Sequence, residues 1–233
     1  MATSAKNNKE KLILDAAINL FNSKGFHATT MDDVAKTAGI SKGLSYFYYK
    51  NKEDLYLAVT KKGFDGLKDI FRDVFKGKGK TGMDMLTDLS LQYIQFAQDN
   101  RMYYDAIVNF MGIVNQYTQE DLRKNINPLV LKSEHFQKLL DIHHDCGKIG
   151  AQMVSQGIKD GSIRPELQPE VTFYTIWSML IGYEKLMGPV RYEGKEIKIH
   201  LDNWKPGFLR LMQDMLKGTI QAQKIQPVQA SLF

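Results

Sequence analysis

The stretch TMDDVAKTAGISKGLSYFYY, residues 30–49, predicts two short helices joined by a tight turn. Thr30 can cap the first helix, because its side-chain oxygen can accept a hydrogen bond from the backbone at Asp33, three residues later. Ser41 can cap the second helix directly after the turn at Gly39. Between these caps the apolar residues recur at helical spacing: Met31, Val34, Ala35 and Ala38. Two helices separated only by a glycine turn indicate a helix-turn-helix arrangement.

Helical periodicity extends over nearly the whole chain, which predicts an all-α fold. A helix whose apolar face ends at Gly25 precedes the helix-turn-helix, and a long helix capped by Asn51 follows it. Beyond the glycine- and lysine-rich loop at residues 76–82, further helices are expected at about 83–99, 101–116, 128–160, 169–188 and 203–223. The last residues, from Gln223 onwards, have no periodicity.

The composition fits a protein with an anionic partner. The chain has 233 residues, 31 Lys and Arg against 26 Asp and Glu, and a net charge of +5. Residues 1–52 alone hold eight lysines and four acidic residues, so the positive charge is concentrated near the helix-turn-helix. A single cysteine, Cys146, allows no internal disulfide and fits a reducing cytosol. The first residues have no signal-peptide core, and no apolar run approaches the roughly 18 residues of a membrane span. We expect a soluble, cytoplasmic protein without a membrane partner.

Four aromatic rings follow one another at the end of the second short helix, from Tyr46 to Tyr49. On a helix Tyr46 and Tyr49 would share one face while Leu44 and Tyr48 would share another, so not all rings can pack against the other helices. We expect Tyr49 to complete the core of a three-helix unit. Tyr46 and Tyr48 are expected to face outwards, where their hydroxyls can reach DNA phosphates.

Residues 13–59 resemble the N-terminal domain of the TetR family of bacterial transcriptional regulators. The matching positions share one register: Phe21, Gly25, Phe26, Thr29, Thr30, Val34, Ala35, Ala38, Gly39, Ser41, Gly43, Tyr46, Tyr48, Lys52 and Leu55. The chain departs from the family pattern at two positions. Leu44 stands where a small or hydroxyl residue is usual, and Ser45 stands where an aliphatic residue usually packs inwards, as though the two had been exchanged. The exchange leaves the fold expectation intact but makes the base preference harder to predict.

The resemblance implies roles for individual residues in DNA binding. Thr30 and the neighbouring backbone N–H would bind a phosphate, and Tyr46, Tyr48 and Lys52 would hold the DNA backbone. The residues nearest the bases would be Lys42, Gly43, Leu44, Ser45 and Phe47. Lys42 is the candidate for a guanine edge, since lysine can donate to O6 and N7, although a solvated lysine is an equally good interpretation.

The resemblance also implies an organisation and a function. Residues 1–55 would be the DNA-binding domain, residues 56–222 a helical bundle for effector binding and dimerisation, and residues 223–233 a flexible tail. The protein would be a homodimeric repressor on double-stranded operator DNA, released by a small apolar or amphipathic effector. A regulator that senses no small molecule is the alternative within this class. No cofactor is expected.

Two groups of residues in the C-terminal part are candidates for these tasks. The candidate effector pocket consists of Tyr103, Ile107, Phe110, Met111, Tyr174, Trp177, Met179, Tyr183 and Glu184. The candidate dimer surface consists of Phe173, Leu180, Phe208, Leu211, Met212 and Met215. Both sets are also typical of an ordinary bundle core, and for each pocket residue the core is the stronger interpretation.

An enzyme is the alternative from another class. His143, His144 and Asp145 contain the His-Asp doublet of helical, metal-dependent phosphohydrolases, but the further ligands that such a metal needs are not evident. Lys80 and its neighbours echo the end of a phosphate-binding loop without its first glycine or its preceding strand. We therefore expect a regulator with no metal site.

Overall fold

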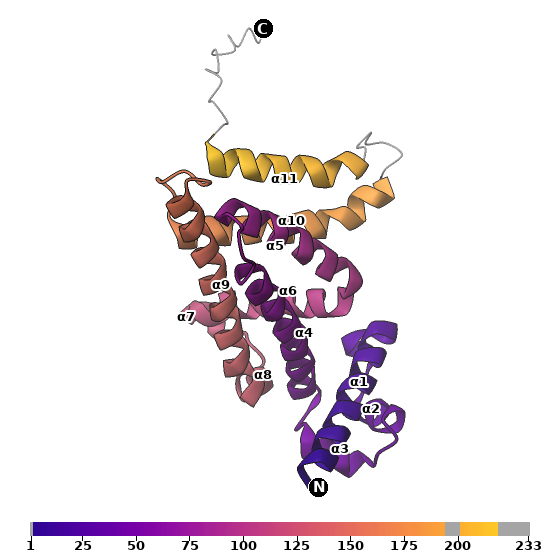
Figure 1. Cartoon of the computed structure of the whole chain (residues 1–233). Coiled ribbons are helices and arrows are strands. Elements are labelled where there is room, and N and C mark those ends of the chain that lie inside the picture. Colours follow the sequence, from indigo (N-terminus) through magenta and orange to yellow (C-terminus); the bar gives the residue numbers. More distant parts are fainter. Residues whose placement is uncertain (1, 194–200, 219–233) are drawn as a thin grey trace. The chain divides into compact units, whose positions relative to one another are not determined.

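The computed structural model describes residues 2–193 and 201–218, and these residues form helices and turns with no strand among them. The all-α prediction is confirmed. The first three helices are α1 (Ala2–Ala28), α2 (Met31–Thr37) and α3 (Lys42–Tyr48), as Figure 1 shows. The α1 helix is broken at Gly25, whose φ of 80° is a left-handed conformation that favours glycine.

The helix-turn-helix forms through the caps that the sequence predicts. The Thr30 hydroxyl oxygen accepts a hydrogen bond from the Asp33 N–H at 3.2 Å, and the Asp33 carboxylate accepts one from the Thr30 N–H at 2.9 Å. This pair is a complete capping box at the start of α2. Gly39 turns the chain with a φ of 64°, and Ser41 then caps α3 by accepting from the Leu44 N–H at 3.2 Å. The predicted arrangement of two short helices is confirmed.

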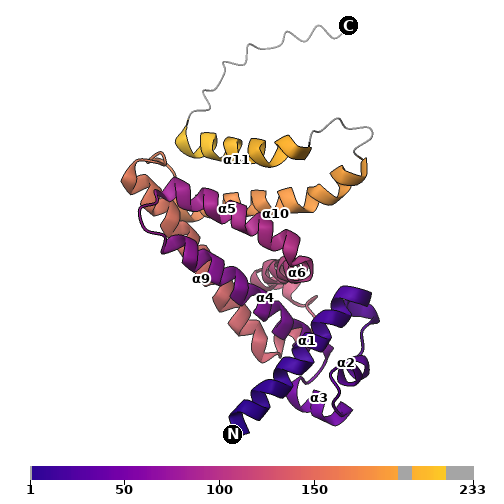
Figure 2. The same cartoon turned by 45° about the vertical axis from the view of Figure 1, so that its right-hand side comes forward.

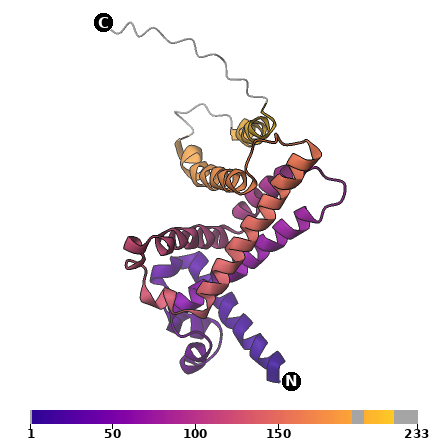
Figure 3. The ribbon, with the colours of Figure 1, turned by 90° about the vertical axis from the view of Figure 1, so that its left-hand side faces the viewer.

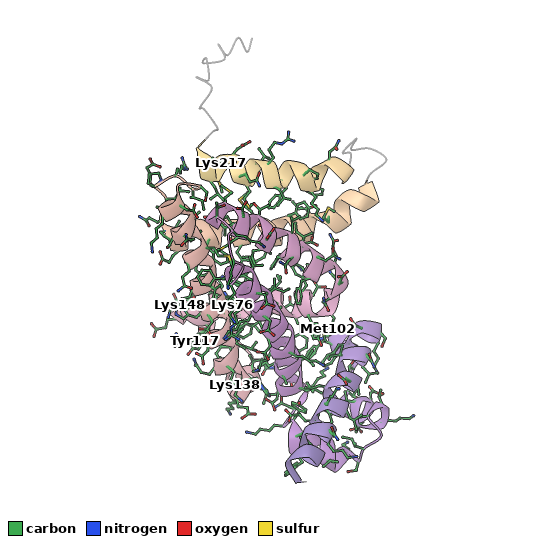
Figure 4. The ribbon with its side chains drawn as sticks, viewed as in Figure 1. Lys76, Met102, Tyr117, Lys138, Lys148 and Lys217 are labelled. Atoms are coloured by element: carbon green, nitrogen blue, oxygen red, sulfur yellow. The ribbon has the colours of Figure 1, made fainter. Side chains whose placement is uncertain are left out.

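A compact apolar core holds the first three helices against the start of α4 (Lys52–Phe75). Met102, labelled in Figure 4, packs onto this core from α6 (Arg101–Thr118). Tyr49 lies within it with only 2 % of its surface exposed, as expected. The buried members of the core are Ile13, Ala16, Ala17, Phe21, Met31, Val34, Tyr49, Leu55, Ala58 and Val59.

The later helices follow the predicted ranges with two exceptions, which are a short helix at residues 120–123 that was not predicted and a break in the helix expected at 128–160. These later helices are α5 (Gly82–Asp99), α6, α7 (Glu120–Arg123), α8 (Pro128–Leu131), α9 (Glu134–Asp160), α10 (Pro169–Glu193) and α11 (Leu201–Lys217). The prediction of a single helix at 128–160 was wrong, because the helix is interrupted between α8 and α9. At this break the Ser133 hydroxyl accepts from the His135 N–H at 3.1 Å and donates to the buried Asp54 carboxylate at 2.5 Å. Ser133 therefore caps α9 and ties its start to the start of α4.

The described residues fall into two compact units. The first comprises those of Met1–Asp73 and Gln92–Ile149, and the second those of Val74–Leu91 and Gly150–Phe233. Inside the first unit α4 and α6 approach very closely, because a Cβ atom on Gly63 would lie 2.8 Å from the Cβ of Tyr103. The first unit thus joins the helix-turn-helix to a closely packed pair of longer helices.

In the second unit α10 and α11 lie side by side, as Figures 2 and 3 show from two directions. The Tyr183 ring on α10 contacts the rings of Trp204 and Phe208 on α11 at centroid distances of 5.1 and 5.0 Å. Glycines allow two further close approaches: Gly82 against the backbone at Gly157, and Gly150 beneath the ring of Phe173. These contacts build a second core that is separate from the one around the helix-turn-helix.

Residues beyond Gly218 lie outside the described residues, and this includes the predicted helix end at residue 223 and the tail at 223–233. The described part of α11 ends at Lys217, where Gly218 takes a φ of 76° and donates its N–H to the Asp214 carbonyl at 3.0 Å. Over residues 2–193 and 201–218, none of the helices has the length and apolar character of a membrane span.

Candidate nucleic-acid interface

Helix α3 presents two opposite faces. Ser45 is fully buried and Tyr49, one turn later, is nearly so, which anchors one face to the core. On the other face Tyr46 is 42 % exposed and Phe47 is 77 % exposed, and Gly43 lies one helical turn before them with open space around it. In helix-turn-helix proteins the second helix of the motif is the one that lies in the major groove, and α3 is the corresponding helix here.

Ser45 does not belong to the exposed face. Its hydroxyl donates to the Lys42 carbonyl at 2.7 Å, and none of its surface is exposed. The helix would have to rotate away from the core before this side chain could approach a base. The exchange between Leu44 and Ser45 therefore places a polar residue at an inward position, while Leu44 is only partly buried.

Lys42 lies at the start of the exposed face and already has an anionic partner. Its ammonium group lies 2.8 Å from one carboxylate oxygen of Asp32 on α2, and this hydrogen bond raises the pKa of Lys42. Both side chains are more than half exposed, so the ion pair is weak in water and can exchange for a DNA partner. Sequence reasoning missed Asp32, because only the fold brings it next to a residue ten positions later.

Thr30 stands at the exposed start of α2, but its polar atoms already have partners. Its hydroxyl donates to the Asp33 carboxylate at 2.7 Å, and Lys24 pairs with the same carboxylate at 2.7 Å. These hydrogen bonds hold the pKa of Asp33 well below its usual range. The Asp33 charge makes this helix end less attractive to a phosphate than an uncapped end would be, although Lys24 offsets part of it.

Lys52 is directed back into its own domain. Its ammonium group donates to the carbonyl oxygens of Phe26 and His27 at 2.9 and 3.3 Å, and it lies 4.4 Å above the centroid of the Phe26 ring. The side chain thereby satisfies backbone acceptors at the end of α1. Tyr48, also expected at the DNA backbone, is half-buried and holds its ring edge-on against Phe47 at 5.6 Å.

The Lys52 contacts lead to a prediction about stability. Replacing Lys52 by methionine should lower the free energy of unfolding by about 2 kcal/mol, because hydrogen bonds to a charged, half-buried group are lost. Lys50→Ala is the matched control, since Lys50 is exposed and only its backbone N–H has a hydrogen bond to Asp54. Urea unfolding of both variants would measure the difference. Equal midpoints for the two would show that the Lys52 contacts contribute nothing.

The candidate pocket residues divide between the two compact units. Those on α6 belong to the first unit, where Ile107 and Phe110 are buried and Tyr103 and Met111 are half-buried. Those on α10 belong to the second unit. Trp177, Tyr183 and Glu184 are buried there, Met179 is half-buried, and Tyr174 is 40 % exposed.

Two cavities of the described residues lie elsewhere, one in each unit. The first has a volume of about 290 Å³ and lies between α1, α4 and α6. The second, of about 530 Å³, is bordered by Arg164 in the turn after α9 and by Lys217 at the end of α11; Figure 4 labels Lys217. None of the nine candidate pocket residues lines either cavity.

The candidate dimer residues divide between buried and accessible positions. Phe173, Leu180 and Met212 are buried within the single chain, and the Met212 sulfur accepts a contact from the Ser90 hydroxyl at 3.5 Å. Leu211 is 62 % exposed, and Phe208 and Met215 are half-buried. Four further exposed positions of α10 form one stripe at helical spacing, and none of them belongs to the predicted dimer set: Val171, Tyr174, Ser178 and Leu186.

The residues proposed for a metal-dependent phosphohydrolase do not converge. His143 packs its ring edge-on against Phe64 at 6.4 Å, and burial lowers the pKa of its imidazole. Asp145 forms an ion pair with Lys68. Within the described ranges no group of three or more His, Cys, Asp or Glu side chains is placed to hold a metal ion.

Comparison with known proteins gives a consistent result. The family description "Bacterial regulatory proteins, tetR family" matches residues 13–59. The uncharacterized HTH-type transcriptional regulator YhgD of Bacillus subtilis is 30% identical over 176 residues, 75% of this chain and 81% of YhgD. The HTH-type transcriptional repressor KstR2 of Rhodococcus jostii is 27% identical over 171 residues, 73% of this chain and 76% of KstR2.

The solved structures agree with this result at the level of the fold. The transcriptional regulator FadR of Bacillus subtilis, solved in complex with stearoyl-CoA, superposes with a TM-score of 0.61 over 88% of this chain and 98% of FadR, at 18% identity. The regulators among these relatives are not enzymes, which removes the phosphohydrolase alternative. The helix-turn-helix with its exposed α3 face, the match to residues 13–59 and the similarity to YhgD together place this chain in the TetR family of DNA-binding transcriptional regulators.

Proposed function

We propose that this protein is a homodimeric repressor that places α3 of each protomer in adjacent major grooves of an operator. The single observation that carries the proposal is the exposed face of Gly43, Tyr46 and Phe47 on a helix that is capped by Ser41 and anchored to the core through Ser45. Tyr46 can donate its hydroxyl to a phosphate, and Lys42 can exchange Asp32 for a base or a phosphate. Ser45 and Lys52 are left out of the proposed contacts, because both are engaged inside the domain.

The proposed dimer surface is the exposed stripe of α10 together with Leu211 on α11. Val171, Leu186 and Leu211 each have more than half of their surface exposed, which is unfavourable for apolar side chains in a folded monomer. Ser178 and Gly182 lie between the larger residues of the stripe and would let a partner helix approach closely. In a dimer with a two-fold axis through this surface, the residues of the stripe would be buried in both protomers.

The proposed effector is a small apolar or amphipathic molecule. FadR, which has the same fold, was solved with stearoyl-CoA, and the buried aromatic and half-buried methionine residues of α6 and α10 are of the kind that line apolar pockets. The effector would stabilise an arrangement of the dimer in which the two α3 helices no longer meet half-sites about 34–36 Å apart. It can shift this equilibrium only by the difference between its affinities for the two arrangements.

The proposal predicts sequence-specific DNA binding. Fluorescence anisotropy would compare labelled DNA from immediately upstream of the gene with scrambled DNA over a range of salt concentrations. We expect a preference of about 10³-fold or more that persists near physiological salt. A duplex selected from a random pool would replace the upstream DNA if the operator lies elsewhere. A protein that selects no sequence and whose binding disappears with salt would contradict the proposal.

The effector proposal has its own test in the same assay. Acyl-CoA thioesters and free fatty acids of several lengths would be titrated into the protein–operator complex. Release of the DNA at a saturating concentration, with a length preference, would support an apolar effector. If no ligand in a wider amphipathic panel releases the DNA, the remaining reading is a regulator without a small-molecule effector.

A further inference from the structure

Phe47 is the most exposed large apolar side chain of the described residues, at 77 %. It lies on α3 one turn after Gly43. A Cβ atom added at Gly43 would meet no other atom within 4 Å, so open space lies beside the Phe47 ring. The core of the domain gains nothing from this ring, because Tyr49 and Ser45 fill the inward positions of the same helix. A single exposed phenylalanine is ordinary on a protein surface, but this one lies on the α3 face that the proposed function directs at DNA.

The ring is held in a defined place. Ser41 caps the start of α3, and the buried Tyr49 ends it with an N–H bond to the Ser45 carbonyl at 3.0 Å. The Tyr48 ring packs edge-on against Phe47 at 5.6 Å with an angle of 86° between the ring planes. Phe47 is therefore presented on a short helix that is capped at its start and anchored to the core at its end.

The chemistry of the ring limits what it can recognise. Phenylalanine has no hydrogen-bonding atom, so it can neither hold a phosphate nor read the donors and acceptors of the base edges. The apolar group that bases present in the major groove is the C5-methyl group of thymine. The neighbours Tyr46 and Lys42 carry the polar atoms that phosphates and guanine edges need.

We propose that Phe47 reads a thymine methyl group at one position of each operator half-site, and so makes this regulator prefer an A·T pair there. The inference rests on the proposed function, because it assumes that α3 enters the major groove. It assigns the base preference to an apolar contact of Phe47, whereas the sequence alone favours Lys42 for a base contact.

The test removes single methyl groups from the DNA. In a duplex selected by the protein from a random pool, each thymine of a half-site is replaced in turn by uracil, which changes the base only by loss of the methyl group. We expect one position at which this change weakens binding about fourfold, the equivalent of one buried methyl group. With Phe47→Ala the affinity should already be reduced, and the same uracil should have no further effect.

Controls separate the possible outcomes. Phe75→Ala is the matched variant, since Phe75 is also exposed but lies at the end of α4, and it should retain the full sensitivity to uracil. Circular dichroism would check that Phe47→Ala folds. Sensitivity to uracil that survives in Phe47→Ala, or the absence of any sensitive position, would overturn the inference and leave the repressor proposal intact. A protein that selects no sequence at all would overturn both.

Discussion

Replacing Gly82 by alanine is expected to lower the free energy of unfolding by about 3 kcal/mol or more, one of the largest effects of any single methyl group in this chain. A Cβ atom at Gly82 would lie 2.1 Å from the backbone nitrogen of Gly157 and 2.5 Å from the carbonyl oxygen of Met153. Both neighbours are backbone atoms of α9, which cannot move aside as a flexible side chain can. The start of α5 would have to withdraw from α9 as a whole.

Withdrawal would also break hydrogen bonds from the start of α5 to the last residue of α9 and to the turn that follows it. The Gly82 N–H donates to the Asp160 carboxylate at 2.9 Å, and the Met83 N–H donates to the Ser162 hydroxyl at 3.2 Å. These acceptors satisfy two of the backbone donors that the start of a helix leaves unpaired. Alanine at Gly82 therefore combines a steric clash with the loss of a helix cap from another part of the chain.

The matched control is Gly112→Ala in α6. A Cβ atom at Gly112 would meet no atom within 4 Å, and the residue lies inside a helix, where alanine is favoured over glycine by up to about 1 kcal/mol. We expect Gly112→Ala to raise the thermal midpoint and Gly82→Ala to lower it by roughly 6–12 °C. Calorimetry of the two variants measures both. A Gly82→Ala protein as stable as wild type would mean that α5 and α9 do not approach as closely as the structure indicates.

The second large effect is expected at the proposed dimer surface. Val171 and Leu211 are 61 % and 62 % exposed, so introducing Asp at both positions should leave the monomer folded. In a symmetric dimer each introduced carboxylate would occur once in each protomer, and both copies would be buried without a partner. Burial of an unpaired charge costs about 3 kcal/mol or more. We expect dimerisation to weaken at least about 100-fold.

Sedimentation equilibrium would measure dimerisation, and anisotropy on the selected operator would measure the consequence for DNA binding. A monomer loses the second half-site contact, so its operator affinity should fall while its weak binding to scrambled DNA persists. Leu129→Asp is the control, because Leu129 is also exposed, at 42 %, but belongs to α8. A stable dimer of the doubly substituted protein would exclude the α10–α11 surface.

Much of the fold could be predicted from residues close together in the sequence. Thr30 with Asp33, Gly39 and Ser41 act over three or four positions, so their spacing alone indicates where α2 and α3 begin and end. The same holds for the glycine at which α1 breaks. Caps and turns are local hydrogen bonds and local backbone conformations, and for that reason a linear pattern contains them.

The break at Ser133 could not be predicted in this way. The apolar periodicity runs through the α8–α9 boundary, but the Ser133 hydroxyl binds Asp54, 79 positions earlier in the chain. Lys52 is a similar case, because its partners are the carbonyls of Phe26 and His27 at the end of another helix. The sequence motif places Lys52 near DNA, whereas the structure engages its ammonium group inside the domain.

The amino-acid order was sufficient for the class of fold, the helix-turn-helix and the membership of the TetR family, because these depend on periodicity and on motifs within residues 13–59. Tertiary structure alone decided which side of each helix is available. Ser45 and Phe47 are two positions apart, yet one is fully buried and the other is 77 % exposed. Likewise Phe173 is buried while Tyr174 next to it is exposed. A helical repeat specifies which residues share a face, but which face meets solvent depends on the neighbouring helices, and their positions are set by packing between residues far apart in the chain.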